Sequence, residues 1–375
     1  MSSNKKIRVL ETIRQGRIGG GESHVLDLVG TMDRTAFEPV VLSFTDGPMI
    51  HALEKIGVQA DVIHSEKPFD FKVWKQVKTY MKENRIDLVH VHGTRANSNV
   101  LWAARRLKLP VIYTIHGWSF HEGLHPVSRR LRIAAEKFIT RRADVNICVS
   151  ESNRHTGEKA FGKFDATVIH NGVNLEKFNP DAAYPDVRAR YGFSAEDIVI
   201  AYVVRITLQK DPISMIQAFA QAQQQVPALK LLMVGEGDLK QEAMETAARL
   251  GLTGKVIFDN FRQDVPAVLN AADIYCLPSL WEGFPIGVLE AMAMGKAVIA
   301  SDVDGTREAV QHESNGLLVP ARDAGALASA LVRLANDNAL RARLQQQAKD
   351  TIRKTYNVGN MTRKIEEVYR RLSVR

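Results

Sequence analysis

The feature that most constrains the fold is an alternation of short apolar runs with segments of helical periodicity along the whole chain. Runs rich in Val and Ile predict strands at residues 7–12, 39–44, 58–64, 88–92, 111–117, 145–150, 167–172, 198–204, 229–235, 255–260, 273–278, 297–301 and 316–320. Runs that are apolar on consecutive positions are typical of strands buried on both faces of a parallel sheet. Between them, segments such as 214–226, 324–334 and 338–352 carry apolar residues at helical spacing. The alternation predicts an α/β fold.

The chain is long enough for this pattern to occur twice. Its 375 residues exceed the roughly 100–200 residues of an ordinary domain. The segment 175–193 carries two prolines and no strand or long-helix pattern, and a new strand begins at Ile198. We therefore predict two doubly wound, Rossmann-like domains, at 1–174 and 175–355, followed by a terminal segment at 356–375. Ligands of such sheets bind at the carboxyl ends of the strands, so we expect the two domains to face a shared central cleft.

Composition excludes several classes of protein. A hydrophobic content of 45% with 25% charged residues is that of a globular protein, and no run approaches the roughly 18 apolar residues of a membrane span. Cys148 and Cys276 lie alone in apolar runs, which disfavours a disulfide framework or a zinc site. The first residues are charged and lack the apolar core of a signal peptide. We expect a cytoplasmic protein.

The positive charge of the chain lies in its first half. Residues 1–170 hold 26 Lys and Arg against 18 Asp and Glu, whereas residues 171–375 hold 24 of each, so the first half accounts for the whole net charge of +8. Part of this excess lies on two segments of helical periodicity, at Lys72, Lys75, Lys78 and Lys82, and at Arg129, Arg130, Arg132 and Lys137. These are either helices packed on the sheet with solvated outer faces, or a basic surface that meets anionic lipid. A nucleic acid partner is not expected, because aromatic residues make up only 7% and no binding motif is present.

Two features of the first half could bind a ligand. The segment GGGESH, at residues 19–24, follows the first predicted strand, and backbone amides at Gly19 and Gly20 could approach an anion at the start of a helix. The alternative is a tight turn without a ligand. His116 ends a predicted strand and is followed by Gly117, so a ligand could come close to it. His90 and His92 lie similarly, and any of these histidines could instead be a structural hydrogen-bonding residue.

The second half carries a cationic pair and a pair of glutamates. Arg205 and Lys210 follow the strand at 198–204 and together could neutralise a diphosphate. Glu282 lies in the loop before a predicted helix and Glu290 lies on that helix, eight positions further along, so the two carboxylates could contact one elongated ligand through its hydroxyl groups. The backbone of the intervening loop could meet phosphate through Gly283, Phe284, Pro285 and Ile286.

The triplet Asp302-Val303-Asp304 needs a separate interpretation. Two carboxylates alone do not supply the roughly six oxygen ligands that a hard metal ion requires. We expect them to start the following helix, where negative charge is favourable, and we predict no metal site.

Together, these segments resemble the retaining glycosyltransferases of the GT-B fold, specifically the large bacterial family with a Glu-x7-Glu motif (group 1, family four). The resemblance covers essentially the whole chain. Its elements occur in the family's order, as GGGESH, IHGWSF, VIHNGVNLEKF, VVRITLQKDP, VGEGDLK and EGFPIGVLEAMAMGKAVIAS.

The resemblance implies a role for each matching residue. It assigns the donor diphosphate to Arg205 and Lys210, sugar hydroxyls to Glu282, the nucleotide ribose to Glu290, and an amide cradle to residues 283–286. His116 matches a histidine beside the donor sugar, Gly19 and Gly20 a loop near phosphate and acceptor, and Gly235 and Glu236 the donor-binding VGEGDLK segment. The closing segment matches a helix that crosses back onto the first domain. Pro285 departs from the glycine that is frequent in the family, as does Asp304-Gly305-Thr306 from a frequent glycine pair.

The implied function is the transfer of a hexose or N-acetylhexosamine, with retention and without a metal or other cofactor, from a nucleotide-diphosphate sugar. A UDP-sugar is the favoured donor and GDP-mannose the next. The acceptor would be a glycan or a lipid-linked glycan in cell-surface polysaccharide or lipopolysaccharide synthesis, and the enzyme would be cytoplasmic or peripheral on the inner face of the membrane. The alternatives are a sugar-nucleotide 2-epimerase of the same fold and a non-catalytic basic module that binds membrane or nucleic acid.

Overall fold

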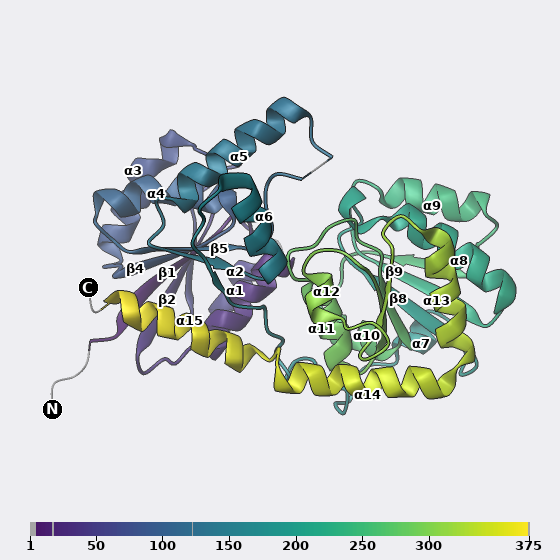
Figure 1. Cartoon of the computed structure of the whole chain (residues 1–375). Coiled ribbons are helices and arrows are strands. Elements are labelled where there is room, and N and C mark those ends of the chain that lie inside the picture. Colours follow the sequence, from purple (N-terminus) through teal and green to yellow (C-terminus); the bar gives the residue numbers. More distant parts are fainter. Residues whose placement is uncertain (1–4, 17–18, 122, 374–375) are drawn as a thin grey trace. The chain divides into compact units, whose positions relative to one another are not determined.

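The chain forms two compact α/β units, each built around its own parallel sheet (Figure 1). The computed structural model describes residues 5–16, 19–121 and 123–373, so the first four residues, on which the expected absence of a signal peptide partly depends, lie outside it. The first unit comprises Met1–Gly172 and Val358–Arg375, and the second comprises Val173–Asn357. The predicted boundaries were placed after residues 174 and 355. The predicted fold class, two doubly wound parallel α/β domains, is confirmed.

The first unit has a seven-stranded sheet in the order β3-β2-β1-β4-β5-β6-β7. Every strand pair in it is parallel. Its elements are β1 (Ile7–Ile13), α1 (Gly20–Thr31), β2 (Phe37–Ser43), α2 (Pro48–Lys55), β3 (Gln59–Val62), α3 (Phe71–Glu83), β4 (Leu88–His92), α4 (Thr94–Arg106), β5 (Val111–Ile115), α5 (Pro126–Thr140), β6 (Val145–Cys148), α6 (Glu151–Phe161), β7 (Thr167–Val168) and α15 (Val358–Ser373).

Helices cover both faces of the first sheet. α3 and α4 pack on one face through side chains such as Val77 and Val100, and α1 and α15 pack on the other through Leu28 and Ile365. α15 is the last helix of the chain, yet it lies against strands of the first unit (Figure 1). This sheet is therefore closed by a helix that the chain supplies only after completing the second unit.

Strand β7 is shorter than the predicted run at 167–172. It pairs with β6 only through Thr167 and Val168. Beyond this point Asn171 hydrogen-bonds His24 of α1, and the backbone N–H of Gly172 donates to the sulfur of Met361 in α15. These contacts take the end of the run out of the sheet and toward the two helices.

The second unit has a six-stranded parallel sheet in the order β10-β9-β8-β11-β12-β13. Its elements are α7 (Val187–Arg190), β8 (Ile198–Val203), a 3-10 turn (Leu208–Lys210), α8 (Pro212–Gln225), β9 (Leu229–Val234), α9 (Lys240–Arg249), β10 (Val256–Asp259), α10 (Val265–Asn270), β11 (Ile274–Leu277), α11 (Ile286–Ala293), β12 (Ala297–Ser301), α12 (Thr306–Ala309), β13 (Leu317–Val319), α13 (Ala324–Asn336) and α14 (Asn338–Lys354). The core includes Tyr202, Phe219 and Leu331, all fully buried.

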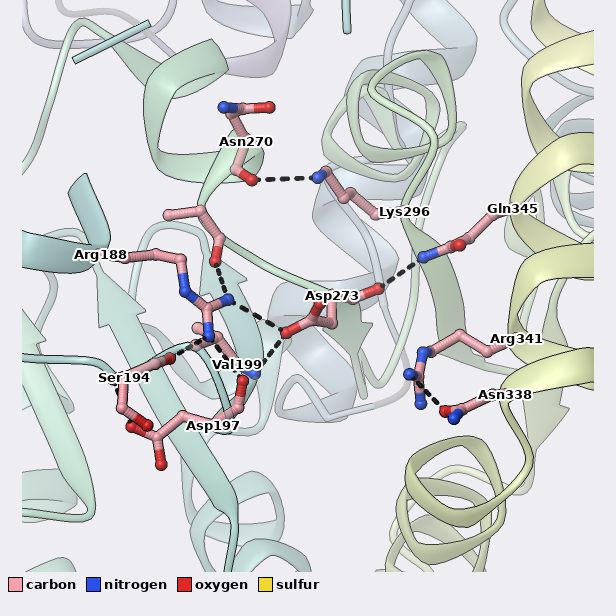
Figure 2. A network of polar contacts seen from close by, with 11 residues as sticks. Arg188, Ser194, Asp197, Val199, Asn270, Asp273, Lys296, Asn338, Arg341 and Gln345 are labelled. Atoms are coloured by element: carbon pink, nitrogen blue, oxygen red, sulfur yellow. Dashed lines mark hydrogen bonds and ion pairs between the residues drawn. The ribbon is translucent and has the colours of Figure 1, made fainter. Parts of the chain in front are cut away.

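A polar network fixes the entry of the chain into this second unit (Figure 2). Arg188 of α7 donates to the Asp273 carboxylate at 3.3 Å and to three backbone carbonyls, those of residues 194, 197 and 271. The same carboxylate accepts from the backbone N–H of Val199 in β8 at 2.8 Å. Beside this network, the Lys296 ammonium donates to the carbonyl oxygen of Asn270 at 3.2 Å. The segment that precedes β8 is therefore anchored to the start of the second sheet.

The half-buried Lys296 provides a pH-dependent test of this packing. Burial lowers its pKa from 10.5 to about 8. The cost of burying the ammonium is thus fully present below pH 8, and it disappears as the pH rises toward the unfolded-state pKa of 10.5. We expect Lys296→Met to be more stable than the wild type at pH 7, by on the order of 1 kcal/mol after allowance for partial exposure.

Urea unfolding of both proteins at intervals between pH 7 and pH 10.5 measures this difference. We expect the advantage of the variant to shrink steadily above pH 8. The exposed Lys177 of the same unit supplies a control, Lys177→Met, with a difference from wild type that stays flat over this range. A constant difference for Lys296→Met would mean that its ammonium is not destabilised by burial.

Within the described ranges, no helix combines the length and apolar character needed to cross a bilayer.

Candidate active site

Arg205 and Lys210 lie at the carboxyl edge of the second sheet. They follow β8, a central strand, on a loop that ends in the 3-10 turn at Leu208–Lys210. The hydroxyl of Tyr202 donates to the backbone oxygen of Lys210 at 3.0 Å and fixes this turn. Arg205 is exposed, and within the described part of the chain its side chain makes no hydrogen bond or ion pair. Arg205 therefore presents a guanidinium group without an ion-pair partner among the described residues, and Lys210 follows it on a turn that is fixed by a hydrogen bond.

Lys210 forms an ion pair with Glu282. The lysine ammonium donates to Glu282 Oε1, and the two side chains are 18% and 7% exposed. Two further hydrogen bonds join their loops, from Gln209 Nε2 to the oxygen of Trp281 and from the N–H of Leu280 to the oxygen of Gln209, both at 2.8 Å. The structure thus brings together two residues that the sequence predicted from separate motifs.

Helix α11 begins immediately after this loop. Pro285 is its N-cap residue and Ile286 its first helical residue, and no side chain caps this end. The first N–H groups of a helix have no intrahelical partner, so that of Ile286 is suited to an oxygen atom of a ligand, whereas Gly283 and Phe284 lie before the N-cap residue. Pro285 has no N–H, so it shapes the predicted cradle without donating to it. The Phe284 ring is buried against Tyr356, with centroids 5.2 Å apart, and anchors the loop.

Glu290 lies further along α11 and is half-buried. Burial, followed by the negative charges of Glu290 and Glu282, raises the pKa of the Tyr275 hydroxyl well above its usual value. The charges of both glutamates therefore reach the buried hydroxyl of Tyr275, which lies beneath α11. Gly287 lies between them, where an added Cβ would come 2.6 Å from the Tyr275 hydroxyl oxygen. The helix can approach the sheet this closely only because this position carries no side chain.

Gly235 and Glu236 support the loop after β8 through their backbone. Gly235 follows β9 with φ of 144°, and a Cβ there would lie 1.8 Å from the oxygen of Val204. The N–H of Ile206 donates to the oxygen of Glu236 at 2.9 Å. The Glu236 carboxylate pairs instead with Lys240, 2.9 Å away. Both residues were predicted to bind the donor, and the structure shows them in contact with the segment that carries the predicted diphosphate ligands.

The aspartates of the D-x-D triplet have separate partners. Asp302 pairs with Arg307, and Asp304 Oδ2 accepts from the N–H of Glu282 at 3.3 Å. The expectation that they start the next helix is wrong, since Gly305 is the N-cap of α12 and Asp304 bonds the neighbouring loop. Asp304 thereby helps to hold Glu282 in place.

In the first unit, Gly19 and Gly20 form the start of α1. Gly19 is the N-cap, in an extended conformation, and Gly20 is the first helical residue. Glu22 in the first turn is buried, and its Oε2 would lie 2.9 Å from a Cβ placed on Gly19. A carboxylate therefore already lies beside this helix terminus. Because the negative charge of Glu22 would repel a phosphate group, this loop is better suited to bind hydroxyl groups.

His116 lies at the carboxyl end of β5 and belongs to a buried polar cluster. Its Nε2 is 3.0 Å from Nδ1 of His92, whose Nε2 is 2.8 Å from the Glu11 carboxylate. Glu11 Oε1 also accepts from the hydroxyl of Tyr369 in α15 at 2.6 Å. Burial lowers the pKa of His92 to about 4 and lowers that of His116 well below its usual value, so both rings are neutral at neutral pH.

Two overlapping groups in this cluster have the composition of metal sites. Ligand atoms of His24, His92 and His116 lie within 4.8 Å of one another, as do those of Glu11, His90 and His92. The sequence pattern predicted no metal site and favoured His116 over His90 and His92. It did not identify Glu11, Tyr369 or His24, although a glutamate inside an apolar strand run was a signal for the first of them.

The predicted basic helices differ in which side they bury. α3 buries Val77 and Met81 and exposes most of its lysines, as an amphipathic helix packed on a sheet does. α5 instead buries Glu136, while its apolar Leu131 and Phe138 are 67% and 45% exposed. α5 still packs on the first sheet through the buried Ile139, and the Glu136 carboxylate beside it accepts hydrogen bonds from Tyr113, Thr94 and Ser119.

Comparison with known families accounts for this arrangement. Residues 18–177 match the model described as Glycosyltransferase Family 4, and residues 184–351 match the model described as Glycosyl transferases group 1. The two matches are consecutive and cover both units. The chain belongs to the group 1 glycosyltransferases.

Curated relatives of this glycosyltransferase act on several acceptors. It is 28% identical to the UDP-Gal:alpha-D-GlcNAc-diphosphoundecaprenol alpha-1,3-galactosyltransferase of Escherichia coli, over 80% of the chain and 79% of that protein. It is also 28% identical to the phosphatidyl-myo-inositol mannosyltransferase of Mycolicibacterium smegmatis, over 95% of the chain and 91% of that protein. Family membership and these relatives favour an enzyme of sugar transfer over the epimerase and the non-catalytic module.

Solved structures share the fold of this glycosyltransferase. HepE of Anabaena, in complex with UDP and glucose, superposes with a TM-score of 0.87 at 23% identity, over 97% of the chain and all of HepE. WaaG, a glycosyltransferase of lipopolysaccharide biosynthesis, superposes with a TM-score of 0.77 at 17% identity, over 96% of the chain and 99% of WaaG. The GT-B fold is thereby established.

Proposed function

We propose that this enzyme transfers a hexose or N-acetylhexosamine, with retention, from a nucleotide-diphosphate sugar to a glycan or lipid-linked acceptor in cell-surface polysaccharide or lipopolysaccharide synthesis. The observation that carries the proposal is the Lys210–Glu282 pair beside the uncapped start of α11. It combines a cation for phosphate, a carboxylate for sugar hydroxyls and the start of a helix without a side-chain cap. The exposed Arg205 adds a second cation for the diphosphate.

A UDP-sugar is the first choice of donor. HepE was solved with UDP-glucose and with UDP and glucose, and the Escherichia coli relative takes UDP-Gal by name. GDP-mannose is the second choice, in keeping with the mannosyltransferases among the relatives. In either donor, we assign the ribose hydroxyls to Glu290 and the diphosphate to Arg205 and Lys210.

The proposed chemistry needs no carboxylate nucleophile. Glu282 is held by Lys210 and by the loop, which suits hydrogen bonding to a sugar hydroxyl better than attack on carbon. The acceptor hydroxyl oxygen bonds to the anomeric carbon on the face from which the diphosphate leaves. The bond from that carbon to the phosphate oxygen breaks, and the acceptor's proton passes to the departing phosphate. Arg205 and Lys210 stabilise the charge that grows on that group, so the proposal requires no metal ion.

A panel of UDP-, GDP- and ADP-sugars tests the donor assignment. For each sugar nucleotide, we would measure the thermal shift of the protein and the consumption of the donor. Donor consumption is measured with and without a lipid-linked glycan acceptor, and each measurement is repeated in the presence of EDTA. We expect a UDP-sugar to give the largest shift and EDTA to have no effect. Absence of a shift with every sugar nucleotide would contradict the proposal, donor conversion without acceptor would favour the epimerase, and abolition of activity by EDTA would show that a metal is needed.

We propose further that the first unit docks on anionic membrane through α5 and the start of α3. Val127 and Leu131 are 58% and 67% exposed on α5, and Phe71 is 72% exposed at the start of α3. The rings of Phe69 and Phe138 are 6.4 Å apart, so the two helices present one surface. The basic residues of the two helices are Lys72, Lys75, Lys78, Lys82, Arg129, Arg130, Arg132 and Lys137. Apolar side chains surrounded by cations fit a lipid surface of negative charge.

Removal of two of these charges is expected to weaken membrane binding about 30-fold, at about 1 kcal/mol for each basic residue. The double variant Lys75→Ala/Arg130→Ala changes two side chains that make no described contact. Flotation with vesicles containing 30% anionic lipid measures the change, and Lys177→Ala/Arg249→Ala, in the second unit, is the matched control. Equal recovery of wild type with neutral and anionic vesicles would rule out electrostatic docking.

A further inference from the structure

One branch of the cluster behind His116 is a series of hydrogen bonds within the first unit. It runs from the Glu11 carboxylate to His92 Nε2 at 2.8 Å, and from His92 Nδ1 to His116 Nε2 at 3.0 Å. Glu11 and His92 are at most 2% exposed, whereas His116 is half-buried at the carboxyl edge of the sheet. We call Glu11, His92 and His116 the relay. Only its last member reaches the surface.

Glu11 is ionised despite being fully buried. Burial opposes its charge, but electrostatic attraction by His90 and hydrogen bonds from His90 and His92 outweigh burial and hold the pKa of Glu11 well below its usual value. The Tyr369 hydroxyl also donates to it. An ionised carboxylate can only accept hydrogen bonds. The ring nitrogen of His92 that faces it must therefore carry a proton.

This proton determines the tautomer of both histidines. A neutral imidazole has one N–H, so with a proton on Nε2 the Nδ1 of His92 is an acceptor. His116 Nε2 faces that acceptor and must be the donor. The proton of neutral His116 is then on Nε2, which leaves a lone pair on its Nδ1. Nδ1 of His116 has no partner within the described part of the chain.

We propose that Glu11 is a positioning residue that acts through His92 to present the unprotonated Nδ1 of His116 to a hydroxyl group of the sugar. The inference rests on the proposed function, which supplies a sugar substrate with hydroxyl groups, and on the role that the family resemblance implies for His116. A bare ring nitrogen accepts from a hydroxyl and offers nothing to a phosphate oxygen, which is itself an acceptor. The relay therefore makes His116 a hydrogen-bond acceptor for a sugar hydroxyl, whereas Arg205 and Lys210 are the residues assigned to phosphate.

A metal ion is the competing occupant of this cluster. His24 Nε2 is buried without a partner among the described residues, and His24 could join His92 and His116 as ligands. However, the 3.0 Å contact between His92 and His116 is already a good hydrogen bond, and a metal at these nitrogens would have to displace its proton. The relay explains the observed contact without an added ion.

Nitrogen NMR of protein labelled with ¹⁵N-histidine tests the relay without any substrate. In the wild type at pH 7 we expect His116 Nδ1 to resonate as an unprotonated ring nitrogen and Nε2 as a protonated one. In Glu11→Gln we expect this single pattern to be lost, because an amide can donate to His92 and reverse the series. Glu136→Gln, which changes another fully buried carboxylate of this unit, should leave His116 unchanged.

A protonated His116 Nδ1 in the wild type would overturn the proposal, and so would an unchanged spectrum in Glu11→Gln. The wild-type spectrum alone decides the tautomer, so the test holds even if Glu11→Gln does not fold. Zn²⁺ titrated into EDTA-treated protein should not bind the histidines. Stoichiometric binding that is lost in His24→Ala would overturn the relay in favour of a metal site.

A double-mutant cycle then connects the relay to the reaction. Glu11→Gln should lower kcat/KM about tenfold, the effect of one misplaced hydrogen bond. In a His116→Gln background, the amide oxygen can accept the hydrogen bond from the sugar hydroxyl regardless of the residue at position 11. Glu11→Gln should then change kcat/KM by less than about twofold, because the two positions are no longer coupled. Additive losses would show that Glu11 acts on structure alone. Because the spectra need no donor, failure of the donor panel and failure of the relay are distinguishable.

Discussion

Replacing Lys210 by alanine is expected to lower kcat by about 10²–10³-fold, the usual effect of removing one positioned group that stabilises transition-state charge. In the proposed reaction, negative charge grows on the departing diphosphate, and Lys210 is the cation held most firmly for that purpose. Its backbone is fixed by Tyr202 and its ammonium by Glu282. At 18% exposure, it is also less screened by solvent than a surface lysine. Steady-state kinetics with saturating donor and acceptor measure the loss.

Ligand binding separates the roles of the three charged residues. Arg205→Ala and Lys210→Ala should each weaken binding of UDP alone, because both cations are assigned to the diphosphate. Glu282→Gln should leave UDP binding nearly unchanged and weaken binding of the UDP-sugar, because this carboxylate is assigned to the sugar. Isothermal titration with both ligands makes the comparison. Arg249→Ala is the control, since Arg249 is exposed at the far end of α9.

Two outcomes would contradict the assignments. If Lys210→Ala retained kcat within about threefold, well short of the effect of a positioned charge, the ammonium would serve only to hold Glu282. If Glu282→Gln weakened UDP and UDP-sugar equally, the carboxylate would act through Lys210 and not on the sugar. Removal of Lys210 leaves a buried carboxylate without its partner, so the double variant Lys210→Met/Glu282→Gln is needed to separate loss of chemistry from loss of packing.

The fold could be predicted from sequence because its determinants are local. Buried parallel strands produce continuous apolar runs, and each predicted run overlaps a strand in the structure. The failures have long-range causes. β7 ends early because Asn171 and Gly172 bond residues of α1 and α15, and the latter lie far along the chain. Such partners leave no trace in the local pattern.

The residues of the site could be predicted from the local sequence, but their contacts with one another could not. Arg205, Lys210 and Glu282 could be predicted because each follows a strand at the functional edge of a sheet. Their ion pair could not, since it depends on how two loops pack. The hydrogen bond between Glu11 and Tyr369 joins residues 358 positions apart. The inward position of Glu136 was also hidden, because its three hydrogen-bond donors come from other segments of the chain.

Gly235→Ala is expected to destabilise the second unit by about 3 kcal/mol or more, which is at the upper end for a single substitution. Its φ of 144° lies in a region that side chains rarely adopt, and the new Cβ would meet the oxygen of Val204 at 1.8 Å. A backbone atom cannot swing away as a side chain can. Either β9 or the loop after β8 must therefore move, and that loop carries Arg205 and Lys210.

The effect can be separated from a general intolerance of positive φ. Gly251 also has positive φ, 69°, but an added Cβ there meets nothing within 4 Å. Gly251→Ala should therefore cost only the conformational strain, about 1 kcal/mol. Urea unfolding of both variants gives the difference, and thermal shift with UDP shows whether the diphosphate ligands are displaced. Equal destabilisation would mean that the clash with Val204 is relieved without cost. If Gly235→Ala were stable but no longer shifted its melting temperature with UDP, the loop after β8 would have moved while the sheet stayed intact. The position of that loop would then depend on the absence of a side chain at Gly235.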